Sequence, residues 1–311
     1  MYQRARNFFA PTAPIVHTLR LRGVIQDGRS GGTLSIRNLE KALEKAFDVK
    51  KNKRLAAVAV SVNSPGGSPV QSELIAGRMT DLSRESGIPF YTFAEDVAAS
   101  GGYWLLSAGH KSFCAETSLV GSIGVVTGGF GFPDLIEKIG VERRILTAGE
   151  NKARNDPFKP VKAEDEDKTR EILTQMHELF KAHVQRARGD RLAADRHEEI
   201  FSGDVWLGDA AVELGLVDDI KGDPRAAMRE MFGQDVELRP ISVGPQVPWP
   251  FSQLQAATGQ SSVTGEGLDS IRLQGAPMGE AAFAGLSMSV SVDSLITAAE
   301  ERALWGKYQT W

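Results

Sequence analysis

Residues 96–109 read DVAASGGYWLLSAG, with Ser100 set between two alanines and two glycines. Small residues on both sides allow a partner backbone to come close, and glycine tolerates a tight turn. The apolar run that follows predicts a helix over residues 101–108, with Ser100 at its start. The first N–H groups of a helix have no partner within it, and the helix dipole favours negative charge there. Such a position stabilises an oxyanion, and Ser100 is therefore our candidate nucleophile.

Strand-like and helix-like segments alternate on both sides of this stretch. The patterns predict strands over 18–25, 55–62, 89–94, 111–115, 119–126 and 142–147. They predict helices over 35–47, 70–85, 101–108 and 135–139, with Ser35 as an N-cap and a turn at residues 96–100. Such alternation is typical of an α/β domain with a largely parallel sheet. Ligands of open α/β sheets bind at the carboxyl ends of the strands, where both glycine-rich loops of this chain are expected.

The character of the sequence changes after residue 160. Residues 162–188 are charged and periodic, and we expect one or two helices there, with a buried stripe made of Leu173, Met176, Leu179, Phe180 and Val184. A short strand, a helix over 209–214 with Gly215 as its cap, and a helix over 223–232 are expected to close the domain.

Three segments follow from these patterns: a lead-in over 1–15, a catalytic domain over 16–232, and an extension over 233–311. Prolines and a Gly/Ser/Gln-rich stretch up to residue 279 predict linker or disorder in the extension. Helical periodicity returns at residues 291–305, where we expect a terminal helix that docks on another surface.

Composition excludes several classes of protein. The net charge of −4 gives no support to a nucleic-acid partner, and the single cysteine, Cys114, excludes an internal disulfide. No Cys/His cluster has the spacing of metal ligands, so we predict no metal and no cofactor. No apolar run is long enough to cross a membrane, and the default location is the cytoplasm. Arg4, Arg6, Phe8 and Phe9 leave open a peripheral contact with the inner membrane or with a neighbouring subunit.

A second glycine-rich loop, Asn63 to Ser68 (NSPGGS), follows the predicted strand 55–62. It lacks the lysine of a phosphate-binding loop and the spacing of a dinucleotide-binding loop. An oxyanion hole with Gly67 N–H as a donor is one interpretation, and a plain tight turn is the other.

A serine nucleophile needs a base, and the residues alone do not single one out. None of the five histidines, His17, His110, His177, His183 and His197, has a distinctive position, and we expect His177 and His183 to face solvent. A lysine becomes a base when burial lowers its pKa. Lys152, Lys159 and Lys162 all fall in a loop region where this is conceivable, and spacing does not separate them.

Four segments together resemble the signal peptide peptidase A family of bacterial serine peptidases, which includes the SohB-like proteins. They are NSPGG (63–67), ASGGYWLLSAG (99–109), TSLVGSIGVV (117–126) and GENKARNDPFKP (149–160). The segment FSGDVWLGDAAVELGLVDDIKG (201–222) is similar to the closing motif of that family.

The resemblance implies a Clp/crotonase-like fold and a serine endopeptidase with a Ser–Lys dyad. Ser100 corresponds to the nucleophile, Lys152 to the general base, and Ser122 to a serine that holds the lysine. Gly67 and Gly101 N–H groups correspond to the oxyanion donors. The family also implies a homo-oligomer in which neighbouring subunits share each site, and peptide substrates such as signal-peptide remnants or unfolded segments.

Two alternatives use related chemistry. A phage-type head-maturation protease has the same dyad, and a crotonase-like acyl-CoA enzyme uses a backbone N–H pair to hold an enolate. The second would need acidic residues at the site and would not need Ser100 or Lys152.

Overall fold

The computed structural model describes residues 13–28, 33–243 and 303. Residues 1–243 form one compact unit, and 244–311 form another. The predicted lead-in (1–15) and terminal helix (291–305) lie largely outside the described residues.

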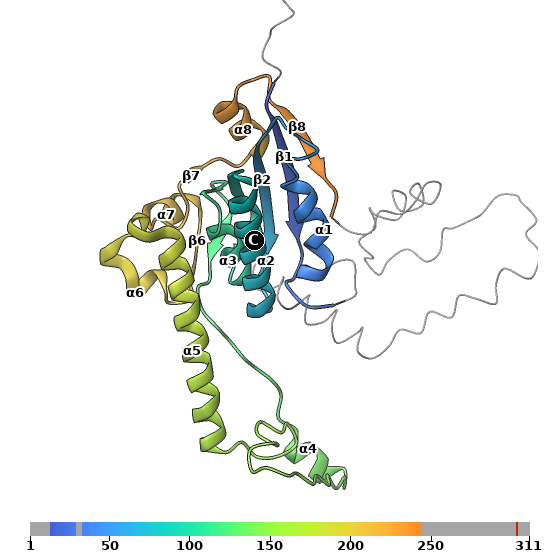
Figure 1. Ribbon diagram of the computed structural model, residues 1–311. Helices are drawn as coiled ribbons and strands as arrows, with labels where there is room; N and C mark the ends of the chain where they lie inside the picture. Colours follow the sequence, from blue (N-terminus) through green and yellow to red (C-terminus); the bar gives the residue numbers. More distant parts are fainter. Residues whose placement is uncertain (1–12, 29–32, 244–302, 304–311) are drawn as a thin grey trace, which may run out of the picture. The chain divides into compact units, whose positions relative to one another are not determined.

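An eight-stranded sheet forms the centre of the compact unit (Figure 1). Its main path runs β6-β5-β3-β2-β1-β8, and β4 joins β3 to β7 beside this path. Every pair is parallel except β5 with β6. The strands are β1 Ile15–Arg22, β2 Leu55–Ser64, β3 Phe90–Ala99, β4 Lys111–Cys114, β5 Leu119–Gly121, β6 Val205–Trp206, β7 Asp219–Ile220 and β8 Glu237–Ile241. The predicted α/β class with a largely parallel sheet is confirmed.

Eight α-helices and two short 3₁₀ turns connect the strands that the structure describes. The helices are α1 Ile36–Ala46, α2 Pro69–Ser86, α3 Gly101–Ser107, α4 Pro133–Lys138, α5 Ala163–Arg188, α6 His197–Ile200, α7 Gly208–Glu213 and α8 Pro224–Phe232. Ser35 caps α1 and Ser68 caps α2, each by accepting a backbone N–H with its side chain.

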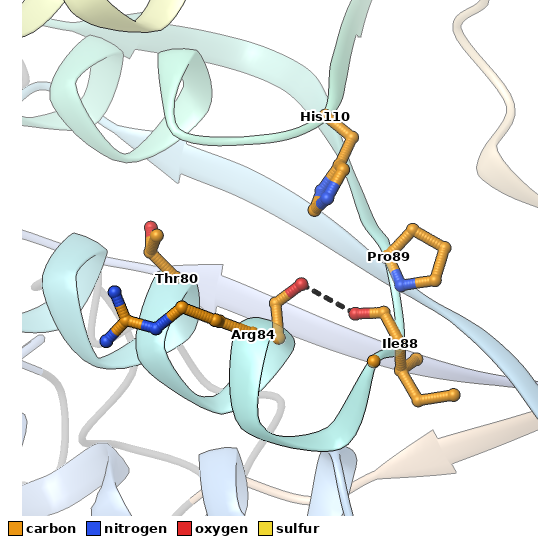
Figure 2. Close-up of a pocket in the computed structure, with 7 residues that line it drawn as sticks. Thr80, Arg84, Ile88, Pro89 and His110 are labelled. Atoms are coloured by element: carbon orange, nitrogen blue, oxygen red, sulfur yellow. Dashed lines mark hydrogen bonds between the residues drawn. The ribbon is translucent and has the colours of Figure 1, made fainter.

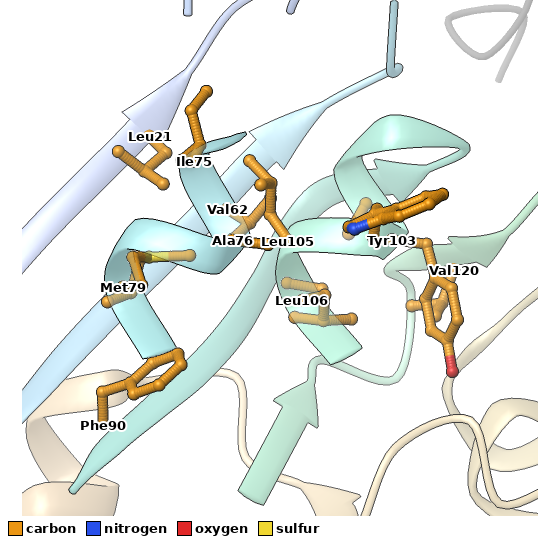
Figure 3. Packing of buried hydrophobic residues seen from close by; sticks show 14 of the residues in the cluster. Leu21, Val62, Ile75, Ala76, Met79, Phe90, Tyr103, Leu105, Leu106 and Val120 are labelled. Carbon is orange, nitrogen blue, oxygen red and sulfur yellow. The ribbon is translucent and has the colours of Figure 1, made fainter. Parts of the chain in front are cut away.

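The sheet packs apolar side chains on both faces because residues of a strand alternate between them. One face meets α1, α2 and α3, where Leu21, Val62, Met79 and Leu105 are fully buried (Figure 3). The other face holds a smaller cluster in which Phe93 and Phe113 stack and Met228 of α8 is buried. β2 is thus covered on both faces, as its continuous apolar run predicts.

β3 is longer than the sequence indicates. Residues 96–99 belong to the strand, so the expected turn at 96–100 is wrong, and the chain turns only at Ser100. These residues stay extended because they pair with β5, a neighbour that the local sequence does not reveal.

Two further expectations are wrong. Residues 142–147 form no strand, since this segment is exposed and pairs with no other strand among the described residues. The predicted extension begins too early: β8 lies beyond residue 232 and pairs with β1, and the compact unit continues to Val243.

The second half of α5 packs on α3, and its first half contacts the preceding segment through the Arg154–Asp165 ion pair and a hydrogen bond from Asn155 Nδ2 to Thr169 Oγ1. Trp104 of α3 stacks on Phe180 and on His183, with ring centroids 4.9 and 4.4 Å apart. Of the predicted stripe only Phe180 and Val184 are buried, and Leu179 is 66% exposed. At its end, the buried Arg188 donates from Nη1 to Asp218 at 2.7 Å and from Nε to the Gly215 carbonyl at 2.8 Å.

Candidate active site

Ser100 lies where β3 ends and α3 begins, in a backbone conformation that is rare for serine. Its φ is 53° and its ψ is −122°. Its N–H donates to the Gly121 carbonyl at 2.8 Å, and its carbonyl accepts from Trp104 N–H at 3.0 Å. Such backbone angles cost conformational free energy, and residues that adopt them cluster at functional sites. The conformation therefore supports the choice of Ser100 as candidate nucleophile.

The loop after β2 packs directly against Ser100. A Cβ added to Gly66 would lie 2.7 Å from Ser100 Cβ and 2.9 Å from Gly101 N. Gly66 and Gly67 have φ values of 102° and 137°, and a Cβ on Gly67 would overlap the Ile25 carbonyl. Only glycine fits this close approach. The fold therefore brings the two glycine-rich loops, predicted separately, to one place.

Two backbone N–H groups near Ser100 remain available for a ligand. Gly101 is the first residue of α3, where an N–H has no intrahelical partner. Gly67 N–H donates to no acceptor among the described residues, because the bridge with Ile25 uses Gly66 O and Ser68 N instead. These are the two donors that the sequence predicts, and their role stays a prediction.

Ser122 comes to the same region through β5. It follows Gly121, whose carbonyl accepts from Ser100 N–H, and its own N–H donates to Asp204 O at 2.6 Å. Ser122 is 6% exposed and, like Ser100, has a positive φ of 52°. The ends of β2, β3 and β5 thus meet at one edge of the sheet, and each carries one of the predicted site segments.

Lys152 lies elsewhere in the chain, in the segment that connects α4 and α5. It is exposed, and its side chain forms no hydrogen bond or ion pair with the residues that the structure describes. This segment is held by contacts of its own: Phe132 N–H donates to Pro157 O at 2.6 Å, and Arg143 lies over the Phe158 ring. A single chain therefore gives Ser100 no contact with its predicted base.

The histidines have structural partners. His17 shares a hydrogen bond with Ala46 O, and His183 shares hydrogen bonds with Trp104 O and Ser107 Oγ. Burial lowers the pKa of His183 to about 4, although the hydrogen bond to Trp104 O opposes this. His177 Nε2 lies 2.9 Å from the carbonyl of Ile123, next to Ser122. The expectation that His177 and His183 face solvent is wrong, because one face of α5 packs on α3 and on the chain after β5.

A shallow pocket of about 400 Å³ lies at the opposite end of β3 (Figure 2). It is lined by Thr80, Ser83, Arg84, Gly87, Ile88, Pro89 and His110. None of the predicted site residues lines it, and Ser83 Oγ is already bonded to Ile88 O at 2.6 Å. We therefore assign the candidate site to the Ser100 edge of the sheet.

The fold and this edge together define a class: a mixed α/β protein with a strained serine between a strand and a helix. Residues 83–237 match the model of peptidase family S49. The chain belongs to this family of serine peptidases.

Curated relatives agree with the family match. The chain is 31% identical to a putative signal peptide peptidase SppA of Enterococcus faecium, over 65% of this chain and 58% of the relative. It is 32% identical to the chloroplastic serine protease SPPA of Arabidopsis thaliana, over 60% of this chain and 27% of the relative.

A longer similarity is to a protein of Brucella abortus named Na(+)/H(+) antiporter NhaA. The two are 40% identical over 295 residues, which make up 94% of this chain and 36% of that protein. The chain thus spans about a third of the length of that relative. No helix among the described residues is long and apolar enough to cross a membrane.

Proposed function

We propose that this chain is a serine endopeptidase in which Ser100 is the nucleophile and Lys152 the general base. The observation that carries the proposal is the packing of Gly66 against Ser100 and Gly101. It puts a serine hydroxyl and two unpaired N–H groups at one edge of the sheet, which is what acyl transfer requires.

The reaction begins when the Lys152 amine accepts the Ser100 hydroxyl proton as Oγ attacks the peptide carbonyl. The tetrahedral oxyanion accepts hydrogen bonds from Gly67 and Gly101 N–H. Lys152 then gives its proton to the departing amine, which leaves an ester on Ser100. Water hydrolyses this ester with Lys152 again acting as base, and Ser122 holds the lysine in place.

The lysine in this proposal comes from a neighbouring copy of the chain. Lys152 is exposed and unpaired among the described residues, and its segment carries exposed apolar side chains. Leu146 is fully exposed and Val161 is 64% exposed. Exposed apolar side chains on one segment are typical of a surface that a partner covers, and a second copy is the partner that also completes the site.

The substrates we propose are peptides and unfolded segments, including remnants of signal peptides. The support for this class of substrate is the similarity to a relative named signal peptide peptidase.

The decisive test is peptide cleavage by the Ser100→Ala and Lys152→Ala variants, with labelling of the native protein by a fluorophosphonate and mass spectrometry of the adduct. We expect each variant to lose cleavage while its oligomer persists, and the adduct to be on Ser100. Full activity of either variant, or an adduct on another serine, overturns the proposal. Turnover of an acyl-CoA by the Ser100→Ala variant would instead favour crotonase-like chemistry.

A further inference from the structure

The pairing of β2 with β3 changes register just before the site. Val62 pairs with Ala94, but Ser64 pairs with Ala98. One residue of β2, Asn63, therefore opposes three residues of β3: Glu95, Asp96 and Val97. We call these three residues the β3 bulge.

On the other side of β3 the neighbouring strand itself changes. Phe93 pairs with Phe113 of β4, and Val97 pairs with Leu119 of β5. Between these two pairs β3 advances four residues (93 to 97) and the neighbouring chain advances six (113 to 119), because that chain passes from β4 to β5. β3 thus changes its neighbour from β4 to β5 at the bulge, and its two extra residues are extra relative to β2.

The bulge decides what lies beside Ser100. In the register before the bulge, Gly66 would be level with Ala98, and Ser100 would lie two residues further on, about 7 Å away. The register after the bulge brings Ser100 level with Gly66, in agreement with the close approach of these two residues. It also brings Ala99 opposite Gly121, next to Ser122. Bulges near active sites commonly re-aim side chains in this way.

Two side chains hold the bulge from its two sides. Asn63 is 1% exposed, and its Nδ2 donates to Asp96 Oδ2 at 2.7 Å. Its carbonyl accepts from Gly23 N–H at 3.0 Å, so Asn63 is fixed at both ends. On the β5 side, Ser118 is 1% exposed and donates from Oγ to Glu95 O at 2.6 Å.

The orientation of the Asn63 side-chain amide is fixed by its hydrogen bond to Asp96. A carboxylate accepts hydrogen bonds, so the amide must turn its NH₂ group toward Asp96. Asn63 Oδ1 is then left buried without a partner among the described residues. Leaving a buried acceptor unpaired costs free energy, which the bond to Asp96 offsets only while the bulge holds Asp96 in place.

We propose that Asn63 and Asp96 are a positioning pair that fixes the β3 bulge and so sets Ser100 in register with Gly66 and Gly101. The inference rests on the proposed function, in which Ser100 is the nucleophile. Neither residue touches the reacting atoms. Their effect is on the placement of the nucleophile relative to the oxyanion donors.

The test is steady-state cleavage of a peptide by Asn63→Ala, Asp96→Ala, Asp96→Asn and the double variant Asn63→Ala/Asp96→Ala, in the full chain. Misplacement by about 1 Å costs up to about 100-fold in rate, so we expect kcat of each alanine variant to fall about tenfold or more. KM should change less than twofold. Asp96→Asn keeps an acceptor oxygen and should retain most of kcat. The double variant should be no worse than either single one, because the pair acts as a unit.

Glu95→Gln is the matched control. Glu95 lies in the same bulge, but its side chain pairs with Arg20 in an exposed salt bridge, which contributes little. Its kcat should stay within twofold of the native value. Thermal unfolding of every variant separates lost placement from lost folding. Asp96 is exposed, so Asp96→Ala is expected to fold. If Asn63→Ala does not fold, the kcat of Asp96→Ala tests the positioning pair.

Native kcat in folded Asp96→Ala, or additive losses in the double variant, would overturn the positioning pair while leaving the proposed function intact. Native activity in Ser100→Ala would overturn the proposed function itself. The two failures are therefore distinguishable.

Discussion

At the scale of single residues, the site depends on three glycines that have no Cβ atom. Gly66, Gly67 and Gly101 each lie where a Cβ would collide with a neighbour: Ser100 Cβ for Gly66, the Ile25 carbonyl for Gly67 and Ser72 Oγ for Gly101. Ser100 itself keeps its side chain at the cost of a positive φ. The Ser100 hydroxyl and the N–H donors can lie close together only because glycine occupies these positions and Ser100 has a positive φ.

Gly66→Ala tests this close approach. The new Cβ would meet Ser100 Cβ and Gly101 N, so we expect kcat to fall about 100-fold or more as the nucleophile moves from the donors. The measurement is peptide cleavage together with the rate of fluorophosphonate labelling at Ser100. Gly77→Ala is the control: nothing lies within 4 Å of its new Cβ on α2, and it should keep native kcat. Unchanged labelling in folded Gly66→Ala would contradict the close approach.

At the scale of secondary structure, α5 illustrates what periodicity can and cannot predict. One or two helices over 162–188 follow from the pattern, and the structure has a single helix there, Ala163–Arg188. The pattern also selects the face that carries Phe180 and Val184. It does not reveal which residues near that face meet a neighbour: Leu179 is exposed, whereas His183 is packed against Trp104. β3 shows the same limit, since its last residues are extended only because β5 lies beside them.

His183 predicts a loss of stability in acid. Its pKa is lowered from 6.5 to about 4, so the unfolded chain binds this proton more readily than the folded one. The contribution of neutral His183 is complete above pH 6.5 and is lost as pH falls toward 4. On the order of 1–3 kcal/mol should disappear over this window. Urea unfolding at pH 7 and pH 4.5 measures it.

The control for this prediction is His183→Gln, which keeps a hydrogen-bonding group but does not titrate. The difference in unfolding free energy between pH 7 and pH 4.5 should be smaller in the variant than in the native protein. Equal differences in the two proteins would show that other groups cause the acid sensitivity.

Replacement of Arg188, the last residue of α5, should lower the stability of the fold. Its guanidinium is buried and bonded to Asp218 and Gly215 O. Burial alone would raise the pKa of Asp218, but hydrogen bonds from Arg188 and Ser112 N–H outweigh it and lower the pKa. Arg188→Met removes one partner of a buried pair, and we expect about 3–5 kcal/mol less stability in denaturant unfolding.

Arg191→Met is the matched comparison, because Arg191 also contacts Asp218 but its side chain is 40% exposed. It should cost about 1 kcal/mol or less. Equal losses in the two variants would contradict the assignment of Arg188 as the main partner of Asp218.

At the scale of the whole molecule, sequence alone predicts the parallel α/β fold and the segments that carry the site, but not their assembly. Ser100, Gly66 and Gly67 stand out because strand, glycine-rich loop and helix follow one another in the chain. The bulge that aligns them is set by pairing between strands that are distant in sequence, and no local pattern encodes it. Lys152 is an exposed loop lysine in the structure, as in the sequence, and nothing within one chain distinguishes its role.

Co-expression of two inactive variants tests whether neighbouring copies share the site. A chain with Ser100→Ala still provides Lys152, and a chain with Lys152→Ala still provides Ser100. In a ring that mixes both chains at random, about one site in four combines an intact Ser100 with an intact Lys152 from the next subunit, so about a quarter of native activity should return. Co-expression of native chains with the double variant Ser100→Ala/Lys152→Ala also leaves about a quarter of the sites intact and calibrates the assay. If both residues of a site belong to one chain, the mixture of single variants stays inactive while the calibration mixture recovers half of the native activity, about twice as much as a shared site allows.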